Sequence, residues 1–226
     1  MKYDNKIVDK ELSICNVRVY GLDESIIASS YPFETGIIKD MSWKDIEEKK
    51  ELQEDKSKKL ASCKSGTGHD CWLKGVVVQF DLKMPEFMWR EMDRYHFRDY
   101  VSSQSKMHSL MKMNIEENCN KFVSPTTIEL LNVSIHLYNN YEDELAKEKI
   151  TLINGEEINL TKENLWRTII SNCPCGYCLG ARITTNYLQL KSIYLQRHNH
   201  KNVEWRYICD WIKSLPMMDE ILKDIK

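Results

Sequence analysis

The segment GVVVQFDLKMP, residues 75–85, places the strongest constraint on the fold. Apolar side chains recur in it at every second position, namely Val76, Val78, Phe80, Leu82 and Met84. Successive side chains of a strand point to opposite faces, so this period predicts a β-strand with one buried face. The same pattern puts Gln79, Asp81 and Lys83 on the other face.

A helix is predicted directly after this strand. Pro85 is tolerated at a first helical position, and PEFMWREMDRYHF continues to Phe97 without a breaker. On such a helix Arg90, Arg94 and Arg98 recur at intervals of four residues. They are therefore predicted to form a basic stripe on one face.

Further elements are predicted on both sides of this unit. Alternation over 12–22, with Cys15, Val17 and Val19 on one face, predicts another strand. A charged helix and a loop are expected at about 42–68, and two further helices are expected to begin near positions 124 and 161. The C-terminal third is predicted to be helical.

Composition excludes several classes of protein. The chain has 226 residues, 42% of them hydrophobic and 29% charged, which are values of a globular protein long enough to bury a core. A formal net charge of -2 provides no basic field for nucleic acid. No apolar run reaches the length of a signal peptide or a membrane span, so we expect a cytoplasmic protein without a membrane partner.

Three of the eight cysteines, Cys173, Cys175 and Cys178, lie together in the segment CPCGYC. Thiolates at this spacing can share one zinc ion if a distant segment supplies a fourth ligand. The favoured interpretation is that they are small apolar turn residues and that no metal is bound.

The segment RYHFRDYVSSQSKMH, residues 94–108, combines cations with hydroxyls. These groups suit a phosphate and a uracil-like base, because cations make charge-assisted hydrogen bonds and hydroxyls make directional ones. A solvated helix end with serine caps explains the same residues equally well. His96 or His108 could act as a general acid or base, since imidazole titrates near neutral pH.

Three segments, in order, resemble signature regions of the flavin-dependent thymidylate synthases. GHDCWLKGVVVQF is similar to that family's Gly-His-x-x-x-x-Glu-His segment leading into a strand, with Gly68, His69 and Phe80 in register. The resemblance implies a flavin-side role for His69. Lys74 and Gly75 stand where the family has Glu and His, so part of its flavin and substrate surroundings differs in this chain.

The second segment, PEFMWREMDRYHFRDYVSSQSKMH, resembles the family's proline and helix that run into Arg-His-Arg and a Ser-containing tail ending in Arg-Tyr. Arg94 fits the first arginine of that triplet, and Tyr95 and His96 replace the next two residues. Ser105 and Lys106 stand near the tail's Ser and Arg when the register shifts by one residue.

The third segment is ARI followed by NYLQLKSIYLQRHNHKNVEWR. It resembles the family's Ala-Arg-aliphatic segment and its later Leu-Arg…His-Ala-Gln-x-Glu-aliphatic-Arg helix. The matching residues are Arg182, Arg197, His200, Glu204 and Arg206. Together the three segments span about the C-terminal three quarters of the chain.

The resemblance implies one α+β domain over 1–226, with an antiparallel or mixed sheet packed with helices. It also implies a homotetramer that holds FAD and dUMP where subunits meet. The family reduces FAD with NADPH, takes a one-carbon unit from methylenetetrahydrofolate and methylates uracil C5 without an enzyme nucleophile. The implied cofactor contacts are His69, Arg94 and His200. The implied substrate contacts are Arg94, Ser105, Lys106, Arg182, Arg197 and Arg206, and the catalytic candidates are His69 and His96.

Three functions remain open from the sequence. The first is FAD-dependent transfer of a one-carbon unit or hydride to a uracil-type nucleotide, which agrees with the absence of a nucleophile motif. The second is a divergent nucleotide- or flavin-binding module without that activity, favoured by Lys74, Gly75 and Tyr95. The third is a zinc-stabilised interaction protein, which rests on CPCGYC alone.

Overall fold

A five-stranded antiparallel sheet, in the order β1-β2-β3-β7-β4, forms the centre of the molecule. The computed structural model describes residues 6–7, 11–35 and 42–223. The strands of this sheet are β1 (Lys6–Ile7), β2 (Ser13–Tyr20), β3 (Val77–Pro85), β4 (Arg98–Ser103) and β7 (Cys178–Asn186). Helices pack on this sheet, which confirms the predicted α+β class.

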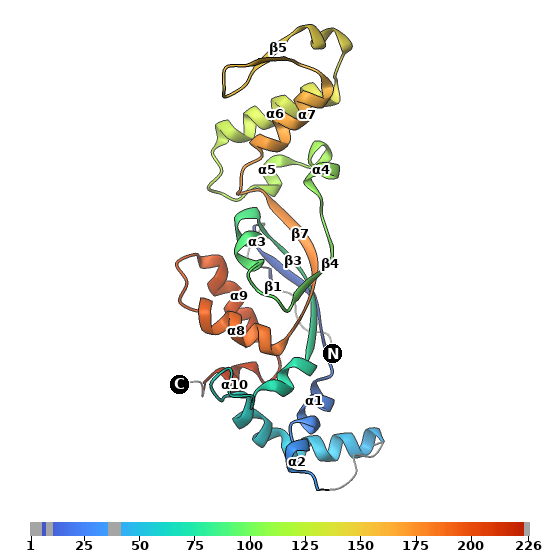
Figure 1. Ribbon diagram of the computed structural model, residues 1–226, viewed down its shortest axis with the longest axis vertical. Coiled ribbons are helices and arrows are strands. Elements are labelled where there is room, and N and C mark those ends of the chain that lie inside the picture. Colours follow the sequence, from blue (N-terminus) through green and yellow to red (C-terminus); the bar gives the residue numbers. More distant parts are fainter. Residues whose placement is uncertain (1–5, 8–10, 36–41, 224–226) are drawn as a thin grey trace.

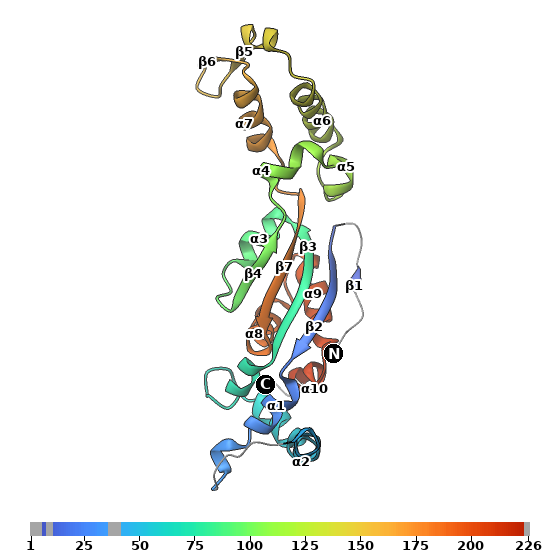
Figure 2. The same ribbon diagram turned by 90° about the vertical axis from the view of Figure 1, so that its right-hand side faces the viewer.

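Helices cover one face of the sheet and extend the molecule at both ends (Figure 1). The covering helices are α3 (Glu86–Met92), α8 (Tyr187–Arg197) and α9 (Val203–Lys213). Near the C-terminus lie α1 (Leu22–Ala28), α2 (Trp43–Ala61) and α10 (Met218–Lys223). In Figure 2 the strands β2, β3, β7 and β4 lie in front of α8 and α9, so the sheet face toward the viewer carries no helix of the described residues. No helix in the described ranges is long and apolar enough to cross a membrane.

A helical insertion between β4 and β7 forms the opposite end of the molecule (Figure 1). It contains α4 (Lys106–Ser109), α5 (Ile115–Asn118), α6 (Pro125–Asn139), α7 (Lys162–Asn172) and the hairpin β5 (Lys149–Thr151) with β6 (Glu157–Asn159). α6 and α7 begin behind Ser124 and Thr161, whose side chains accept hydrogen bonds from backbone N–H groups of the first turn. Both predicted helix starts are therefore confirmed.

Two hydrophobic cores hold these parts together. The main core lies between the sheet and α8–α10 and includes all five alternating residues of the segment 76–84, which are buried as predicted. The second core lies inside the insertion and includes Leu131, Ile135, Leu165 and Ile169. The insertion thus buries an apolar centre of its own, because its amphipathic helices face one another.

β2 reverses its alternation at a β-bulge. Its register with β3 shifts between Cys15 and Arg18, and Asn16 has a φ of 52°. Val17 and Val19 are buried, whereas Cys15 faces the helix-free side, where it lines a cavity. The prediction that Cys15 shares a face with the two valines is therefore wrong, because the extra residue of a bulge changes the phase of the strand.

The helix after Pro85 is shorter than predicted. α3 ends at Met92, and Arg98 already belongs to strand β4, where it pairs with Thr185 of β7. The Arg98 guanidinium is buried, forms an ion pair with Asp93 and lies 4.3 Å from the Tyr100 ring centroid. Pairing with β7 thus takes Arg98 out of the helix, so the predicted basic stripe does not form.

The C-terminal third is helical except for β7, a central strand that the sequence pattern did not reveal. Ala181, Ile183 and Thr185 alternate toward the main core. Of these three core-facing residues, Ala181 is small and Thr185 is polar, so only Ile183 is a large apolar side chain. The hydrophobic period is therefore weaker in β7 than in β3.

A fully buried lysine joins α8 to the loop between α2 and β3. Lys191 Nζ donates hydrogen bonds to the carbonyl oxygens of Ala61 (2.7 Å) and Cys63 (2.8 Å) and to Asp70 Oδ2 (2.8 Å). These contacts use all three donors of the ammonium group. The side chains of Lys191 and Asp70 are 0% and 3% exposed, so water does not screen the pair. Lys191 therefore closes the loop at both ends and fixes it to α8.

Replacing Lys191 by Met is expected to destabilise the protein by about 3–5 kcal/mol, because the Asp70 carboxylate would stay buried without a partner. Urea unfolding followed by circular dichroism measures the change. The matched control is Lys149→Met, since Lys149 and its partner Glu157 are both more than half exposed and that pair contributes under about 1 kcal/mol. An equally small decrease in the free energy of unfolding in both variants would contradict a structural role for the buried ammonium.

Candidate functional site

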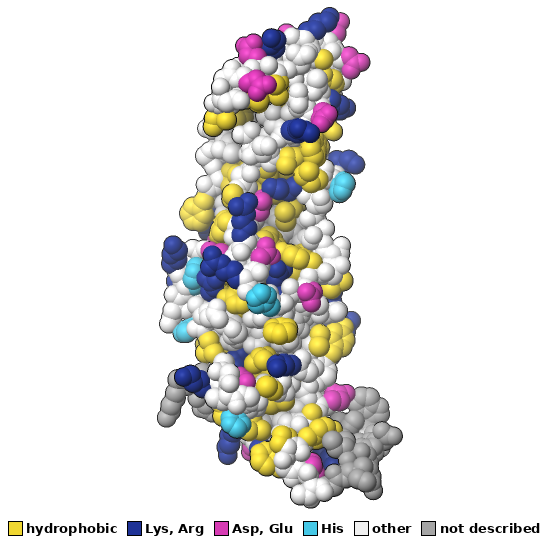
Figure 3. Space-filling view, viewed as in Figure 1, with side chains coloured by type: hydrophobic (Ala, Val, Ile, Leu, Met, Phe, Trp, Pro, Cys, Tyr) yellow, Lys and Arg dark blue, Asp and Glu magenta, His cyan; other side chains and the backbone are white. Residues whose placement is uncertain are grey.

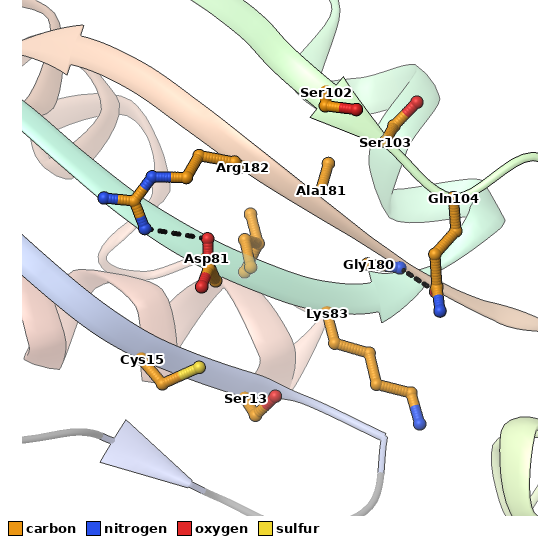
Figure 4. A pocket seen from close by; sticks show the side chains of 11 residues that line it. Ser13, Cys15, Asp81, Lys83, Ser102, Ser103, Gln104, Gly180, Ala181 and Arg182 are labelled. Atoms are coloured by element: carbon orange, nitrogen blue, oxygen red, sulfur yellow. Dashed lines mark hydrogen bonds and ion pairs between the residues drawn. The ribbon is translucent and has the colours of Figure 1, made fainter.

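A cavity of about 470 Å³, the sheet-face pocket, lies on the helix-free face of the sheet (Figure 4). Its floor is a row of cross-strand neighbours, in which Asp81 of β3 lies opposite Cys15 of β2 and Arg182 of β7. Ser102 of β4 lies opposite Arg182 on the other side. The remaining lining residues are Ser13, Leu82, Lys83, Ser103, Gln104, Gly180 and Ala181.

Arg182 and Asp81 form the charged centre of this pocket. Arg182 Nη1 donates to Asp81 Oδ1 at 2.9 Å and to the Asn16 carbonyl oxygen at 3.4 Å. Asn16 Nδ2 donates to Asp81 Oδ2 at 2.6 Å, so both carboxylate oxygens are used. Nε and Nη2 of Arg182 make no hydrogen bond to any residue that the structure describes. An edge of the guanidinium therefore remains for a ligand.

The rim of the pocket is formed where β4 ends. Gln104 exchanges two hydrogen bonds with the Gly180 backbone, one from its own N–H (2.9 Å) and one to its side-chain Oε1 (2.7 Å). Ser105 and Lys106 follow directly, but they do not line the pocket. Lys106 Nζ donates to Glu86 Oε2 at 2.6 Å, so its charge is compensated within the chain.

Two adjoining cavities of about 340 and 290 Å³ share Phe97, Gln189 and Ser192. We call the pair the α8 groove, because α8 forms one wall along its whole length. The opposite wall of the larger cavity is the loop containing Ser65, Gly66, Gly68, Asp70, Cys71 and Lys74. The opposite wall of the smaller cavity is the turn containing Arg94, Tyr95 and His96.

Several predicted site residues lie at the α8 groove. Arg94, His96 and Arg197 line it, and His69 lies between two lining residues of the loop. Arg94 makes no hydrogen bond or ion pair within the described part of the chain, and both histidines are exposed. Basic and histidine side chains gather at the level of α3 and α9 on the face shown in Figure 3.

Arg197 is held by a network at the end of the groove. Its Nε donates to the Tyr95 hydroxyl at 2.9 Å, and its Nη1 lies 3.3 Å from Glu91 Oε2 and 2.9 Å from His200 Nε2. Trp205 Nε1 donates to the same Glu91 oxygen at 2.6 Å. His200 thus contacts Arg197 rather than lining the groove. Glu91, the centre of this network, carried no signal in the sequence.

The predicted substrate arginines do not meet within one chain. Arg94 and Arg197 lie at the groove, which α8 borders on the helix-covered side of the sheet, whereas Arg182 lies in the pocket on the other side. Arg206 is on the exposed side of α9 and lines neither cavity. The sheet therefore separates two groups of cations.

Comparison with solved structures identifies the fold. The chain is similar to flavin-dependent thymidylate synthase ThyX from Helicobacter pylori complexed with FAD and dUMP, with 13% identity and a TM-score of 0.59 over 96% of this chain and 100% of that chain. The chain shares the ThyX fold. A second ThyX structure from Helicobacter pylori with FAD and dUMP gives 13% identity and a TM-score of 0.57 over 94% and 96% of the two chains. No protein-family model and no curated protein matches the sequence.

The cysteines of CPCGYC lie at the start of β7 and beside the second core. Cys175 is exposed, Cys178 is buried, and none of the three forms a disulfide. A Cβ atom at Gly176 would come within 2.5 Å of Val123 Cγ2, so this turn packs closely against the insertion. Among the described residues, no three His, Cys, Asp or Glu side chains group in a way that could hold a metal.

Alkylation should separate these thiols. Burial raises the pKa of Cys173 to about 12, so almost none of it is thiolate at pH 8, and thiolate is the reactive form. We expect iodoacetamide to modify exposed Cys175 well before Cys173, as measured by peptide mass spectrometry. Raising the pH toward 10 should increase the rate at Cys173 steadily, because its pKa lies above that range. Equal rates at pH 8 would contradict this description of the turn.

Proposed function

We propose that this protein binds FAD and a uracil-type nucleotide and transfers a one-carbon unit or a hydride to the base, as a thymidylate synthase-like enzyme. One observation carries the proposal. Cavities lined by arginines with unused donors occur in a chain that shares the ThyX fold, and the similar ThyX structures hold FAD and dUMP. The flavin would supply the redox chemistry, while the protein supplies binding and orientation.

The α8 groove suits the flavin. It is elongated, with Lys74 near one end, Arg94 near the other and the half-exposed Phe97 ring between them. Cations can hold phosphate groups, and an aromatic face can stack on a planar ring. His69 and Arg94 would contact the cofactor directly, and His200 would act through Arg197. NADPH and methylenetetrahydrofolate would be co-substrates.

The sheet-face pocket suits the pyrimidine nucleotide. The unused edge of Arg182 can donate to a phosphate or carbonyl oxygen, and Ser102 and Ser103 offer hydroxyls to a base or sugar. Lys106 would reach a phosphate only by exchanging its present partner, Glu86. His96, at the groove, is the candidate that could exchange a proton with a ligand.

A binding module without this activity is the second candidate, and a close contact favours it. Gly75 stands where the resemblance places a family His. A Cβ atom at Gly75 would come within 2.4 Å of Ser25 Oγ, so α1 occupies the space that a side chain would need. Whatever the family's imidazole contributes, this position does not supply it.

The flavin claim is tested by the visible spectrum of the purified protein and by FAD titration. We expect blue-region absorption, and we expect Arg94→Ala to weaken FAD binding about tenfold, because one charge-assisted hydrogen bond is lost. The matched control is Arg90→Ala, since Arg90 is an exposed arginine of the neighbouring α3 that does not line the groove.

An activity assay then distinguishes an enzyme from a binding module. The protein is incubated with dUMP, NADPH and methylenetetrahydrofolate, and mass spectrometry measures the conversion of dUMP to dTMP. A protein that binds no flavin would contradict the enzyme, and one that binds neither flavin nor nucleotide would contradict both candidates.

Oligomerisation is a second consequence of the proposal. The pocket and the groove of one chain lie on opposite sides of its sheet, so a nucleotide and a flavin can meet only if another copy brings its groove to the pocket. We expect a homotetramer by multi-angle light scattering at micromolar concentration. A monomeric mass that persists with FAD and dUMP added would contradict a shared site.

A further inference from the structure

We infer that Asp81 determines how strongly the sheet-face pocket distinguishes a nucleotide from its nucleoside. Asp81 neutralises Arg182, so the phosphate of a nucleotide adds little to the binding affinity. The inference rests on the proposed function, since it concerns which pyrimidine ligand this pocket prefers. A nucleoside and its monophosphate share the base and the sugar. The pocket is expected to distinguish them only weakly.

The geometry of the ion pair is the first ground. Arg182 Nη1 lies 2.9 Å from Asp81 Oδ1, and the two side chains are only 29% and 35% exposed. Asn16 holds the other carboxylate oxygen at 2.6 Å, so the carboxylate cannot easily turn away. A phosphate that approached the open edge of Arg182 would therefore also approach a fixed negative charge.

Among the described residues that line the pocket, no other cation compensates for this carboxylate at the same place. Lys83 lines the pocket but points away from Arg182 (Figure 4). Lys106, beside the rim, is bound to Glu86. The charge that a ligand meets at the guanidinium is thus set mainly by Asp81 and Arg182, and these two cancel.

Cys15 provides an independent sign of the local potential. Its thiol lines the same pocket, and Asn16 Nδ2 lies 3.9 Å from its Sγ atom. Burial raises the pKa of Cys15 most, the Asp81 carboxylate raises it further, and Arg182 lowers it by less. The effect of the Asp81 carboxylate on the pKa of this thiol is therefore larger than that of the Arg182 guanidinium. This agrees with a pocket that does not favour anions.

The test compares dUMP with deoxyuridine by calorimetry in the full chain, using wild type, Asp81→Asn and Arg182→Gln. We expect Asp81→Asn to increase the preference for dUMP over deoxyuridine about tenfold, because Arg182 is no longer neutralised. Arg182→Gln should shift the preference the other way, since an unpaired carboxylate remains. Lower dUMP affinity in Asp81→Asn, with unchanged deoxyuridine affinity, would overturn the inference and show instead that Asp81 only orients Arg182.

A second readout needs no nucleotide. Iodoacetamide alkylation of Cys15 at pH 8 should become about threefold faster in Asp81→Asn and slower in Arg182→Gln, because the thiolate fraction follows the local charge. Exposed Cys71, outside this pocket, is the internal reference. If neither pyrimidine binds wild type, the proposed function fails for this pocket, while the alkylation rates still decide the role of Asp81. Unchanged Cys15 rates in both variants would overturn it.

Discussion

The arrangement of the α8 groove depends on the hydrogen bonds of the buried Lys191 ammonium group. It bonds to two backbone carbonyls and one carboxylate, and these come from the end of α2 and from both ends of the following loop. Removing an ion from water is costly, so a buried lysine persists only where its partners are fixed. The loop that carries His69 therefore cannot shift relative to α8 without breaking this pair. Stability and the shape of the groove depend on the same contact.

Elements with a strong local pattern could be predicted from the sequence, and elements defined by their neighbours could not. β3 alternates strictly because one of its faces is buried along its whole length. β7 lies beside it, but its core-facing residues include the small Ala181 and the polar Thr185, so its hydrophobic period is weak. The prediction that put Arg98 on the preceding helix failed for a similar reason, since Arg98 begins a strand that forms only because β7 offers a partner. Tertiary pairing overrides local propensity at both places.

The candidate site was predictable in its chemistry but not in its grouping. Arg94, His96 and Arg182, which residue type or the resemblance singled out, all lie at cavities. Which of them lie together depends on the order of the strands. Asp81 appeared in the sequence only as a residue of the polar face of β3. Its pairing with Arg182, 101 positions away, requires β3 and β7 to be neighbours.

The departure from the family pattern at Gly75 is part of the packing of this chain. A Cβ atom at Gly75 would collide with Ser25, and one at Gly21 would come within 2.8 Å of the Gly75 carbonyl oxygen. Gly21 also has a φ of 69°, a conformation that other residues adopt only with strain. The start of α1 therefore fits against Gly75 from both directions. An imidazole at that position would require the Ser25 side chain to give way, so the difference from the family pattern at Gly75 goes together with the packing of α1.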